Sequence, residues 1–147
     1  MAKKYLLDSN IFIHILRKRP EVRLQIERVG WENCCIAEPS IVELLYGAEC
    51  SASPEKNIAL VEELISHIEI IPFNICIREF CKQKARLRRL GTPIEDYDLF
   101  IGTTAVALGF TLVSENTKHL SRIENLELEN WVIRQSYFYN KKAVVET

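Results

Sequence analysis

The residues Tyr5-Leu6-Leu7-Asp8-Ser9-Asn10 carry the clearest signal of the architecture. Its apolar run stops at once on polar residues, which is typical of a buried strand that leads into a helix cap. Further strands are expected over residues 34–37, 68–71 and 110–113, and a weaker one near 126–128 or 131–133. Segments with helical spacing of apolar residues lie between the four clear strands.

Six helices are expected, and two of them open with capping-box spacing. Ser40 stands three residues before Glu43, and Thr92 three before Glu95. The expected helices cover about residues 9–19, 21–29, 40–49, 75–90 and 92–109, and a further helix after the break at 51–54 carries Ile58, Val61, Leu64 and Ile65. This alternation favours a single α/β domain with a mainly parallel central sheet of four or five strands flanked by helices. We expect that domain over residues 1–133, followed by a C-terminal tail of unknown role at 134–147.

Composition and charge narrow the class of protein. The chain has 147 residues, 48% of them hydrophobic, but no apolar run approaches the length of a membrane span, and an early acidic residue argues against a signal peptide. A cytoplasmic protein without a membrane partner is therefore expected. The five cysteines are odd in number and lack C-x-x-C spacing, so we expect them reduced and mostly buried. The net charge of −1 means that any binding of nucleic acid needs local basic patches, cations or a partner.

Carboxylate and amide side chains recur where the predicted strands end. Asp8 follows the first strand and Asn116 the fourth, while Glu43 and Asp98 lie near the starts of helices. Ligands of open parallel sheets bind beyond the carboxyl ends of the strands, so these groups should meet at one edge. Clustered acids repel one another unless a divalent cation such as Mg²⁺ or Mn²⁺ binds them. Such a site can hydrolyse a phosphodiester without a Ser, His or Cys nucleophile.

Each of these residues also has a simpler explanation. Asp8 and Asn10 are good helix caps, Glu43 could only close its capping box, and Asp98 could be a solvated charge. Their common edge of the sheet favours the functional interpretation over these local ones.

Several motifs together resemble the PIN-domain ribonucleases, specifically the VapC-type toxins of toxin–antitoxin pairs. The resemblance covers residues 5–131 and rests on the order and spacing of the motifs. They are Leu6-Leu7-Asp8-Ser9-Asn10, Ser40-Ile41-Val42-Glu43-Leu44 with Tyr46-Gly47-Ala48-Glu49, Gly91-Thr92-Pro93-Ile94 with Tyr97-Asp98 and Ile101, Leu112-Val113-Ser114-Glu115-Asn116 with His119-Leu120, and the segment from Leu126 to Trp131.

The resemblance implies a metal-dependent endoribonuclease and the toxin of a type II toxin–antitoxin system. It assigns the catalytic and metal-binding roles to Asp8, Glu43 and Asp98, with Mg²⁺ or Mn²⁺ as cofactor. It also implies an RNA substrate, which in such relatives can be a transfer RNA, a small cognate antitoxin and a homodimer. The supporting residues are Asn116, Ser114, Ser9 and Asn10.

This chain departs from the family pattern at three positions. Ser9 and Ser114 replace the usual threonines and keep the hydroxyl, while Asn116 replaces a fourth acid by an uncharged amide, as in many relatives. Two further acids lie nearby: Glu115 is expected to be solvated rather than a ligand, and Asp96 to be a charge at a helix N-terminus.

Basic residues on the helix expected at 75–90 are candidates for contact with RNA phosphates. Arg86, Arg88 and Arg89 are the strongest of them, although a charged run is commonly just a solvated face. His119 is a weaker candidate for RNA contact near the mouth of the site.

Other functions fit the motifs less well. A haloacid-dehalogenase-like phosphatase needs D-x-D where this chain has Asp8-Ser9-Asn10, and the acid pair and late lysine of a receiver domain are not evident. The alternative that stays open is a non-catalytic module on the same fold that binds RNA or protein.

Overall fold

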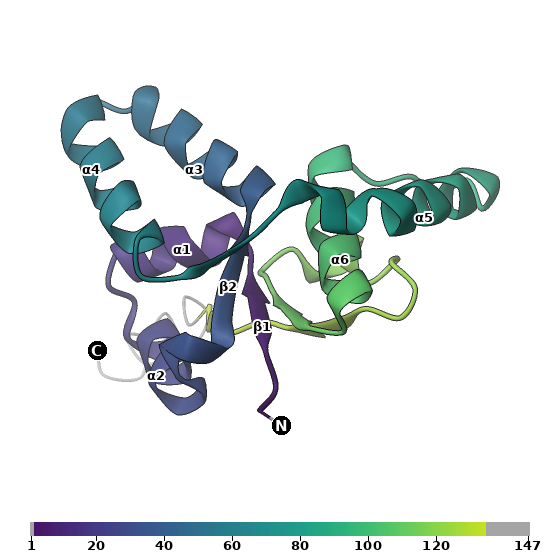
Figure 1. Cartoon of the computed structure of the whole chain (residues 1–147), viewed down its shortest axis with the longest axis horizontal. Helices are drawn as coiled ribbons and strands as arrows, with labels where there is room; N and C mark the ends of the chain where they lie inside the picture. The colour runs from purple at the N-terminus through teal and green to yellow at the C-terminus, as the bar shows by residue number, and fades with distance from the viewer. Residues whose placement is uncertain (1, 135–147) are drawn as a thin grey trace, which may run out of the picture.

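A five-stranded, all-parallel sheet forms the centre of the molecule in the computed structural model, which describes residues 2–134 (Figure 1). The strands are β1 (Tyr5–Leu7), β2 (Cys34–Ala37), β3 (Glu69–Ile71), β4 (Thr111–Val113) and β5 (Glu127–Glu129), in the order β3-β2-β1-β4-β5. The expected α/β architecture is confirmed, and the weak strand lies at 127–129 rather than at 131–133. The proposed tail from residue 135 onward lies outside the described residues.

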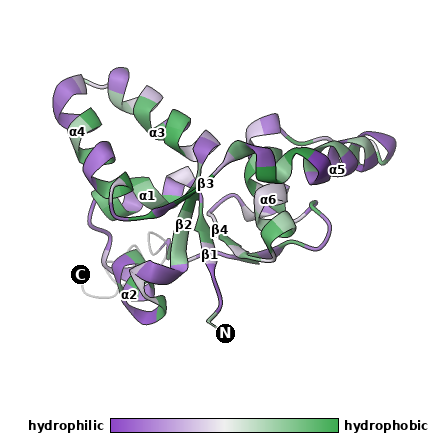
Figure 2. Cartoon of the chain, in the orientation of Figure 1, coloured by the Kyte–Doolittle hydropathy of each residue, from purple (hydrophilic) through white to green (hydrophobic). Residues whose placement is uncertain are grey.

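Helices cover both faces of the sheet because successive strand residues point to opposite sides. Leu7, Ile36 and Val113 belong to one core, and Leu6, Cys35 and Leu112 to the other. The first core is covered by α1 (Ser9–Leu16), α2 (Pro20–Val29), α3 (Glu38–Glu49) and α4 (Pro54–Ile65), and the second by α5 (Ile77–Arg89), α6 (Asp96–Leu108) and α7 (Thr117–Leu120). Short 3-10 turns lie at Trp31–Asn33 and Phe73–Cys76. Figure 2 shows hydrophobic strands at the centre and hydrophilic stretches on outer helices such as α4 and α5.

The strand order reverses at β1. The chain moves outward from β1 through β2 to β3, then returns to place β4 on the other side of β1. Leu7 pairs with Val113 at the ends of these two strands, and the Asp8 N–H donates to the Val113 carbonyl at 2.9 Å. The carboxyl ends of β1 and β4 therefore form the switch point at which open α/β sheets bind ligands.

Both predicted capping boxes are wrong. Helix α3 begins at Glu38, because Pro39 suits the first turn of a helix, and the Ser40 hydroxyl bonds to Tyr97 instead of capping. Helix α6 begins only at Asp96, with Glu95 at the cap position, and the segment before it is held by a bond from Arg122 to the Pro93 carbonyl. The helix starts therefore lie two and four residues from the predicted ones.

Other local expectations hold in part. Helix α1 ends at Leu16 rather than near Arg19, since Lys18 adopts a left-handed backbone (φ 60°) that breaks the helix. All five cysteines are free as expected, with Cys34, Cys35 and Cys76 buried and the other two exposed. No helix among residues 2–134 is long and apolar enough to cross a membrane.

The end of the described chain is tied back to the body of the domain. Trp131 packs against Tyr5 with ring centroids 5.5 Å apart. The Arg19 guanidinium donates to the Ile133 carbonyl at 2.9 Å, and the Ile133 N–H donates to the Glu21 carboxylate at 3.1 Å. Residues beyond β5 thus belong to the folded domain at least as far as Arg134.

Candidate active site

Asp8 is the centre of the candidate site. It caps α1 at the end of β1 and is 2% exposed, yet it carries an ionisable carboxylate. Oδ1 accepts from the Ser9 N–H at 2.7 Å and the Tyr97 hydroxyl at 2.9 Å. Oδ2 accepts from the Ser114 hydroxyl at 2.7 Å and the Asn10 amide at 3.4 Å. All these donors are neutral groups, so the carboxylate is oriented without being neutralised.

A chain of hydroxyl groups joins Asp8 to Glu43. The Tyr97 hydroxyl lies 3.0 Å from the Ser9 hydroxyl and 3.0 Å from that of Ser40. Ser9 in turn donates to Glu43 Oε1 at 3.1 Å. Glu43 is exposed and stands at the open side of the site, whereas Asp8 lies at its buried base.

Asp98 completes the acidic group from the first turn of α6. The Asn116 amide donates to Asp98 Oδ2 at 2.8 Å, and the Asn116 N–H donates to the Ser114 hydroxyl at 3.0 Å. Ser114 therefore links the carboxylate after β1 to the loop after β4. Asn116 presents its amide nitrogen to Asp98, so its role in this structure is to orient that carboxylate.

The charges of these acids are poorly compensated. Burial raises the pKa of Asp98 above its ordinary value, and the nearby Asp8 raises it further, while His119 and the Asn116 bond act the other way. Among residues 2–134, no lysine or arginine forms an ion pair with Asp8, Glu43 or Asp98. Burial and the charge of Asp8 raise the pKa of Tyr97, so its hydroxyl stays protonated and remains a donor.

Glu115 differs from its neighbours because it is paired. Its carboxylate accepts from His14 Nε2, and from Arg134 Nε and Nη2 at 2.8 and 2.9 Å. Burial alone would raise the pKa of Glu115, but the bonds from His14 and Arg134 outweigh it and hold this pKa below its usual value. Asp96 also has a partner, Lys84, at 2.9 Å. The expectation that Glu115 is solvated is therefore wrong, because its carboxylate is paired with Arg134 and hydrogen-bonded to His14.

The acids fit a hard divalent cation by their chemistry. Carboxylate oxygens in excess of positive charge are the donors that Mg²⁺ and Mn²⁺ prefer. No three His, Cys, Asp or Glu side chains of the described chain form a ready-made metal cage. Mg²⁺ does not require one, since one or two carboxylates, waters and substrate phosphates commonly hold it. Asp8 and Asp98 are the pair that could hold the ion, with Glu43 within reach of the same opening.

Comparison with known proteins places this arrangement in a family. The PIN domain family matches residues 5–126, which is most of the chain and includes Asp8, Glu43, Asp98 and Asn116. The chain is a PIN-domain protein of the VapC group. Its relatives include the tRNA(fMet)-specific endonuclease VapC of Salmonella typhimurium, 33% identical over 87% of this chain and 98% of that protein. Ribonuclease VapC2 of Rickettsia felis is 36% identical over 86% of this chain and 97% of its own length.

Solved VapBC complexes share the fold of this VapC-type chain. The DNA-bound VapBC of Salmonella typhimurium superposes with a TM-score of 0.82 at 32% identity, covering 88% of this chain and 99% of that one. VapBC2 of Rickettsia felis, bound to a DNA fragment from its promoter, gives a TM-score of 0.81 at 32% identity, with 87% and 98% covered.

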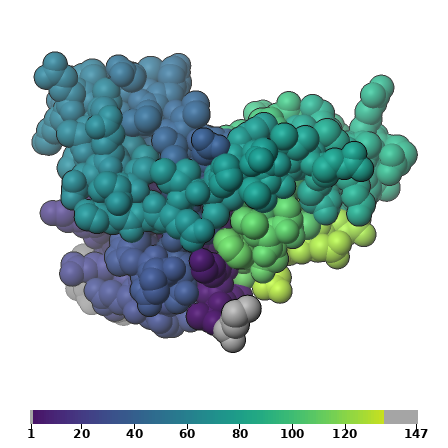
Figure 3. All heavy atoms as spheres, in the orientation of Figure 1, coloured from purple at the N-terminus to yellow at the C-terminus, as the bar shows by residue number. Residues whose placement is uncertain are grey.

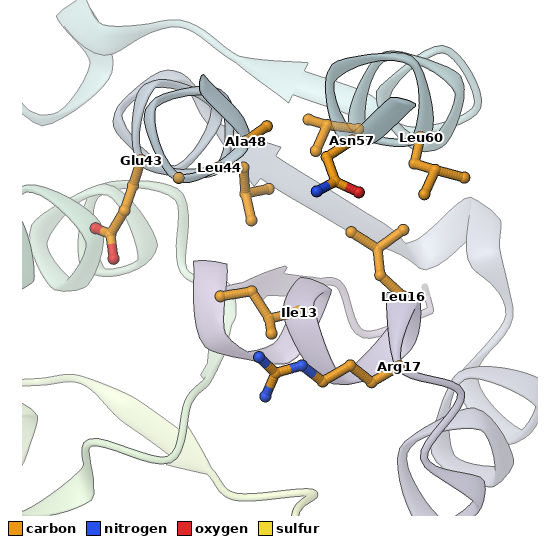
Figure 4. A pocket seen from close by; sticks show the side chains of 10 residues that line it. Ile13, Leu16, Arg17, Glu43, Leu44, Ala48, Asn57 and Leu60 are labelled. Carbon is orange, nitrogen blue, oxygen red and sulfur yellow. The ribbon is translucent and has the colours of Figure 1, made fainter. Parts of the chain in front are cut away.

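A pocket of about 370 Å³ opens beside the acidic group of the VapC-type site. Figure 4 shows Ile13 and Leu16 of α1 facing Leu44 of α3 and the helix α4, with Glu43 at the far end of the row from Leu60. The pocket is lined mainly by apolar side chains together with Arg17 and Asn57, and Glu43 lines it where it meets the candidate site.

The sequence located the acids and four of their supporting residues, but missed two others. Asp8, Ser9, Asn10, Ser114, Asp98 and Asn116 come together as expected, and Glu43 joins them through Ser9. Tyr97 and Ser40 were not assigned to the site, although Tyr97 directly precedes Asp98 and a Tyr-Asp pair at a helix start was a usable signal. Nothing in the spacing of His14 and Arg134 indicated that both contact Glu115.

Proposed function

We propose that this chain is a metal-dependent endoribonuclease that hydrolyses RNA phosphodiester bonds and acts as the toxin of a type II toxin–antitoxin pair. The observation that carries the proposal is the buried Asp8 carboxylate, which is held by neutral donors beside Asp98 and forms no ion pair with a lysine or arginine of residues 2–134. The named activities of the VapC relatives support the same reaction class.

Each residue of the site has a role that follows from its position. Asp8 and Asp98 would hold Mg²⁺ or Mn²⁺, which when bound offsets phosphate charge and lowers the pKa of a water. The Ser9 N–H, Tyr97 and Ser114 keep Asp8 oriented. Glu43 is exposed at the mouth, where a carboxylate can accept a proton from the water that attacks the phosphate.

A structured RNA, such as a transfer RNA, is the proposed substrate. The Salmonella relative is named for a transfer RNA, and a cytoplasmic location follows from such a substrate. Arg88 and Arg89 are exposed on α5, which stands at the opposite end of the long axis from α3 and α4 (Figure 3). Arg86 is less available, because its guanidinium donates to the Arg122 carbonyl at 2.5 Å and pairs with Glu124 at 3.2 Å.

Two protein partners complete the proposal. A small cognate antitoxin would occupy the apolar pocket between α1, α3 and α4 and present an Arg or Lys to the acids, as a cation there stands in for the metal. The VapBC complexes among the structural neighbours support such a partner. A homodimer is proposed as well, since Val42 and Tyr46 of α3 are 68% and 70% exposed.

Mapping new RNA ends tests the function. The purified, antitoxin-free protein is incubated with total cellular RNA in EDTA, in Mg²⁺ and in Mn²⁺, and the new 5′ ends are sequenced. We expect ends that appear only with a divalent ion and that concentrate in one structured RNA. Cleavage that persists in EDTA would contradict the metal dependence, and ends spread over all RNAs would contradict the substrate class.

Absence of cleavage would favour the non-catalytic module instead. Folded protein, checked by circular dichroism, that binds RNA in a filter assay but produces no new ends with either metal would overturn the enzymatic proposal.

A further inference from the structure

His14 is a polar side chain buried on the core-facing side of an apolar helix. It is 6% exposed, and its Nδ1 is buried without a hydrogen-bond partner among the described residues. Burying an unpaired polar atom destabilises a protein. The proposed reaction gives His14 no role. Its side chain forms one hydrogen bond among the described residues, from Nε2 to Glu115, and we therefore look for its function there.

Arg134 holds the same carboxylate from the opposite direction. Its Nε donates to Glu115 Oε2 and its Nη2 to Glu115 Oε1, a two-point contact that fixes orientation as well as distance. Glu115 is thereby clamped between α1 and the chain that follows β5. The loop of Glu115, the helix α1 and the chain after β5 are far apart in the sequence, and this carboxylate joins all three.

The clamped residue sits between the two side chains that orient the acids. Ser114 donates to Asp8 and Asn116 donates to Asp98. The Glu115 N–H also donates to Asn10 Oδ1 at 3.4 Å, and Asn10 contacts both Asp8 and Ser114. Movement of Glu115 would therefore move the donors of both carboxylates at once.

We propose that the clamp of His14 and Arg134 on Glu115 is a positioning device that fixes loop 114–116 and so sets the geometry of Asp8 and Asp98. The three clamp residues contact no substrate and act only through that loop. The consequence for catalysis rests on the proposed ribonuclease function, whereas the consequence for the order of the loop does not.

Arg134→Gln breaks the clamp, and Arg19→Gln is its matched control. Arg19 also donates two bonds to a glutamate, Glu21, and also ties the end of the chain to the body of the domain. Among the described residues it forms no hydrogen bond with Asp8, Asp98 or Glu115, although it lies near enough to Glu115 for their charges to interact. Arg134→Lys keeps the charge and tests for partial rescue. Thermal unfolding of all variants shows how much stability each change costs.

Amide hydrogen exchange reports on the loop without any RNA. We expect exchange at residues 114–116 to become about tenfold faster in Arg134→Gln, and to stay at the wild-type rate in Arg19→Gln at equal stability loss. Arg134→Lys should fall between Arg134→Gln and wild type. Unchanged exchange in Arg134→Gln, or equal acceleration in both glutamine variants, would overturn the proposal.

Cleavage kinetics test the second consequence, on the RNA identified by end mapping. Arg134→Gln should lower kcat about tenfold and leave KM nearly unchanged, as loss of a partner that orients a ligand does. A raised KM with unchanged kcat would mean that Arg134 holds RNA, and would overturn the positioning role. If wild type cleaves no RNA, the ribonuclease proposal fails while the exchange experiment still decides whether the clamp orders the loop.

Discussion

At the scale of single residues, Tyr97 does more than its position in the sequence suggests. Its hydroxyl contacts Asp8 and Ser9 at the start of α1 and Ser40 of α3, and its environment keeps it protonated. A donor shared by an acid and two hydroxyls restricts where each of them can lie.

Tyr97→Phe should therefore affect stability and activity together. Removing the hydroxyl leaves buried partners unsatisfied and should cost about 1–3 kcal/mol of unfolding free energy. Cleavage should fall about tenfold because Asp8 loses an orienting donor. Tyr5→Phe is the control, because it removes a tyrosine hydroxyl at the start of β1, at the end of the strand away from Asp8. Equal loss of activity in both variants would contradict the orienting role of Tyr97. Denaturant unfolding and initial cleavage rates provide the measurements.

Asp98 illustrates a site that is strained by its own charges. Because burial and Asp8 disfavour its charged form, Asp98→Asn should slightly stabilise the metal-free protein at neutral pH, by less than about 1 kcal/mol since solvent screens this half-buried carboxylate. The bond with Asn116 can persist, since an asparagine oxygen also accepts. Adding Mg²⁺ or Mn²⁺ should raise the melting temperature of the wild type but not of the variant. A metal-free variant less stable than wild type would contradict this interpretation.

Acids and their supports differ in how far the sequence predicts them. Asp8 and Asp98 stand at a strand end and a helix start, where position alone indicates a site. Tyr97, His14 and Arg134 act through contacts between segments remote in the sequence, and a single residue carries no periodic signal of such a contact. Glu43 was located by its place in the helix after the second strand, and the simpler explanation, a capping box with Ser40, is wrong.

At the scale of secondary structure elements, the helix α5 carries two kinds of arginine. Arg86 is bonded to the segment that follows α7, whereas Arg88 and Arg89 are exposed. The sequence alone could not distinguish the bonded arginine from the exposed ones, because all three lie close together on one charged helix.

Alanine substitutions on α5 should separate the two roles. Arg86→Ala should lower the free energy of unfolding by about 1–2 kcal/mol through lost hydrogen bonds. Arg88→Ala and Arg89→Ala should change stability by less than about 0.5 kcal/mol, weaken RNA binding and reduce its dependence on salt. Filter binding across a salt series measures the affinity for RNA and its salt dependence. If Arg88→Ala and Arg89→Ala both kept the wild-type salt dependence, α5 would not be part of the RNA-binding surface.

The pair of Arg19 and Glu21 at the start of α2 makes stability depend on pH. The Arg19 bond lowers the pKa of Glu21 to about 2, so the carboxylate stabilises the folded state above its unfolded pKa of 4.5. Glu21→Gln should cost about 1 kcal/mol at pH 7, because the partly exposed pair is screened by solvent. The difference in unfolding free energy between Glu21→Gln and wild type should shrink as pH falls from 4.5 toward about 2. Urea unfolding over this pH range measures it. A difference that grows on acidification would be contrary to this.

At the scale of the whole molecule, the topology explains why distant residues meet. The parallel sheet and its alternating helices were predictable, because strand runs and helical periods are local patterns. The spatial order of the strands was not, because it depends on which edge each crossover joins. That order places the ends of β1 and β4 side by side and so brings residue 8 to residue 114.

The most direct test compares two aspartates of the same chain. Asp8→Asn and Asp96→Asn each remove one negative charge, but Asp96 is exposed and paired with Lys84, outside the site. With Mg²⁺ or Mn²⁺ and the mapped RNA, Asp8→Asn should cleave about 100-fold more slowly than wild type, or slower still. Asp96→Asn should cleave at the wild-type rate. Folded Asp8→Asn protein that cleaves RNA at the wild-type rate would contradict a carboxylate active site in this chain.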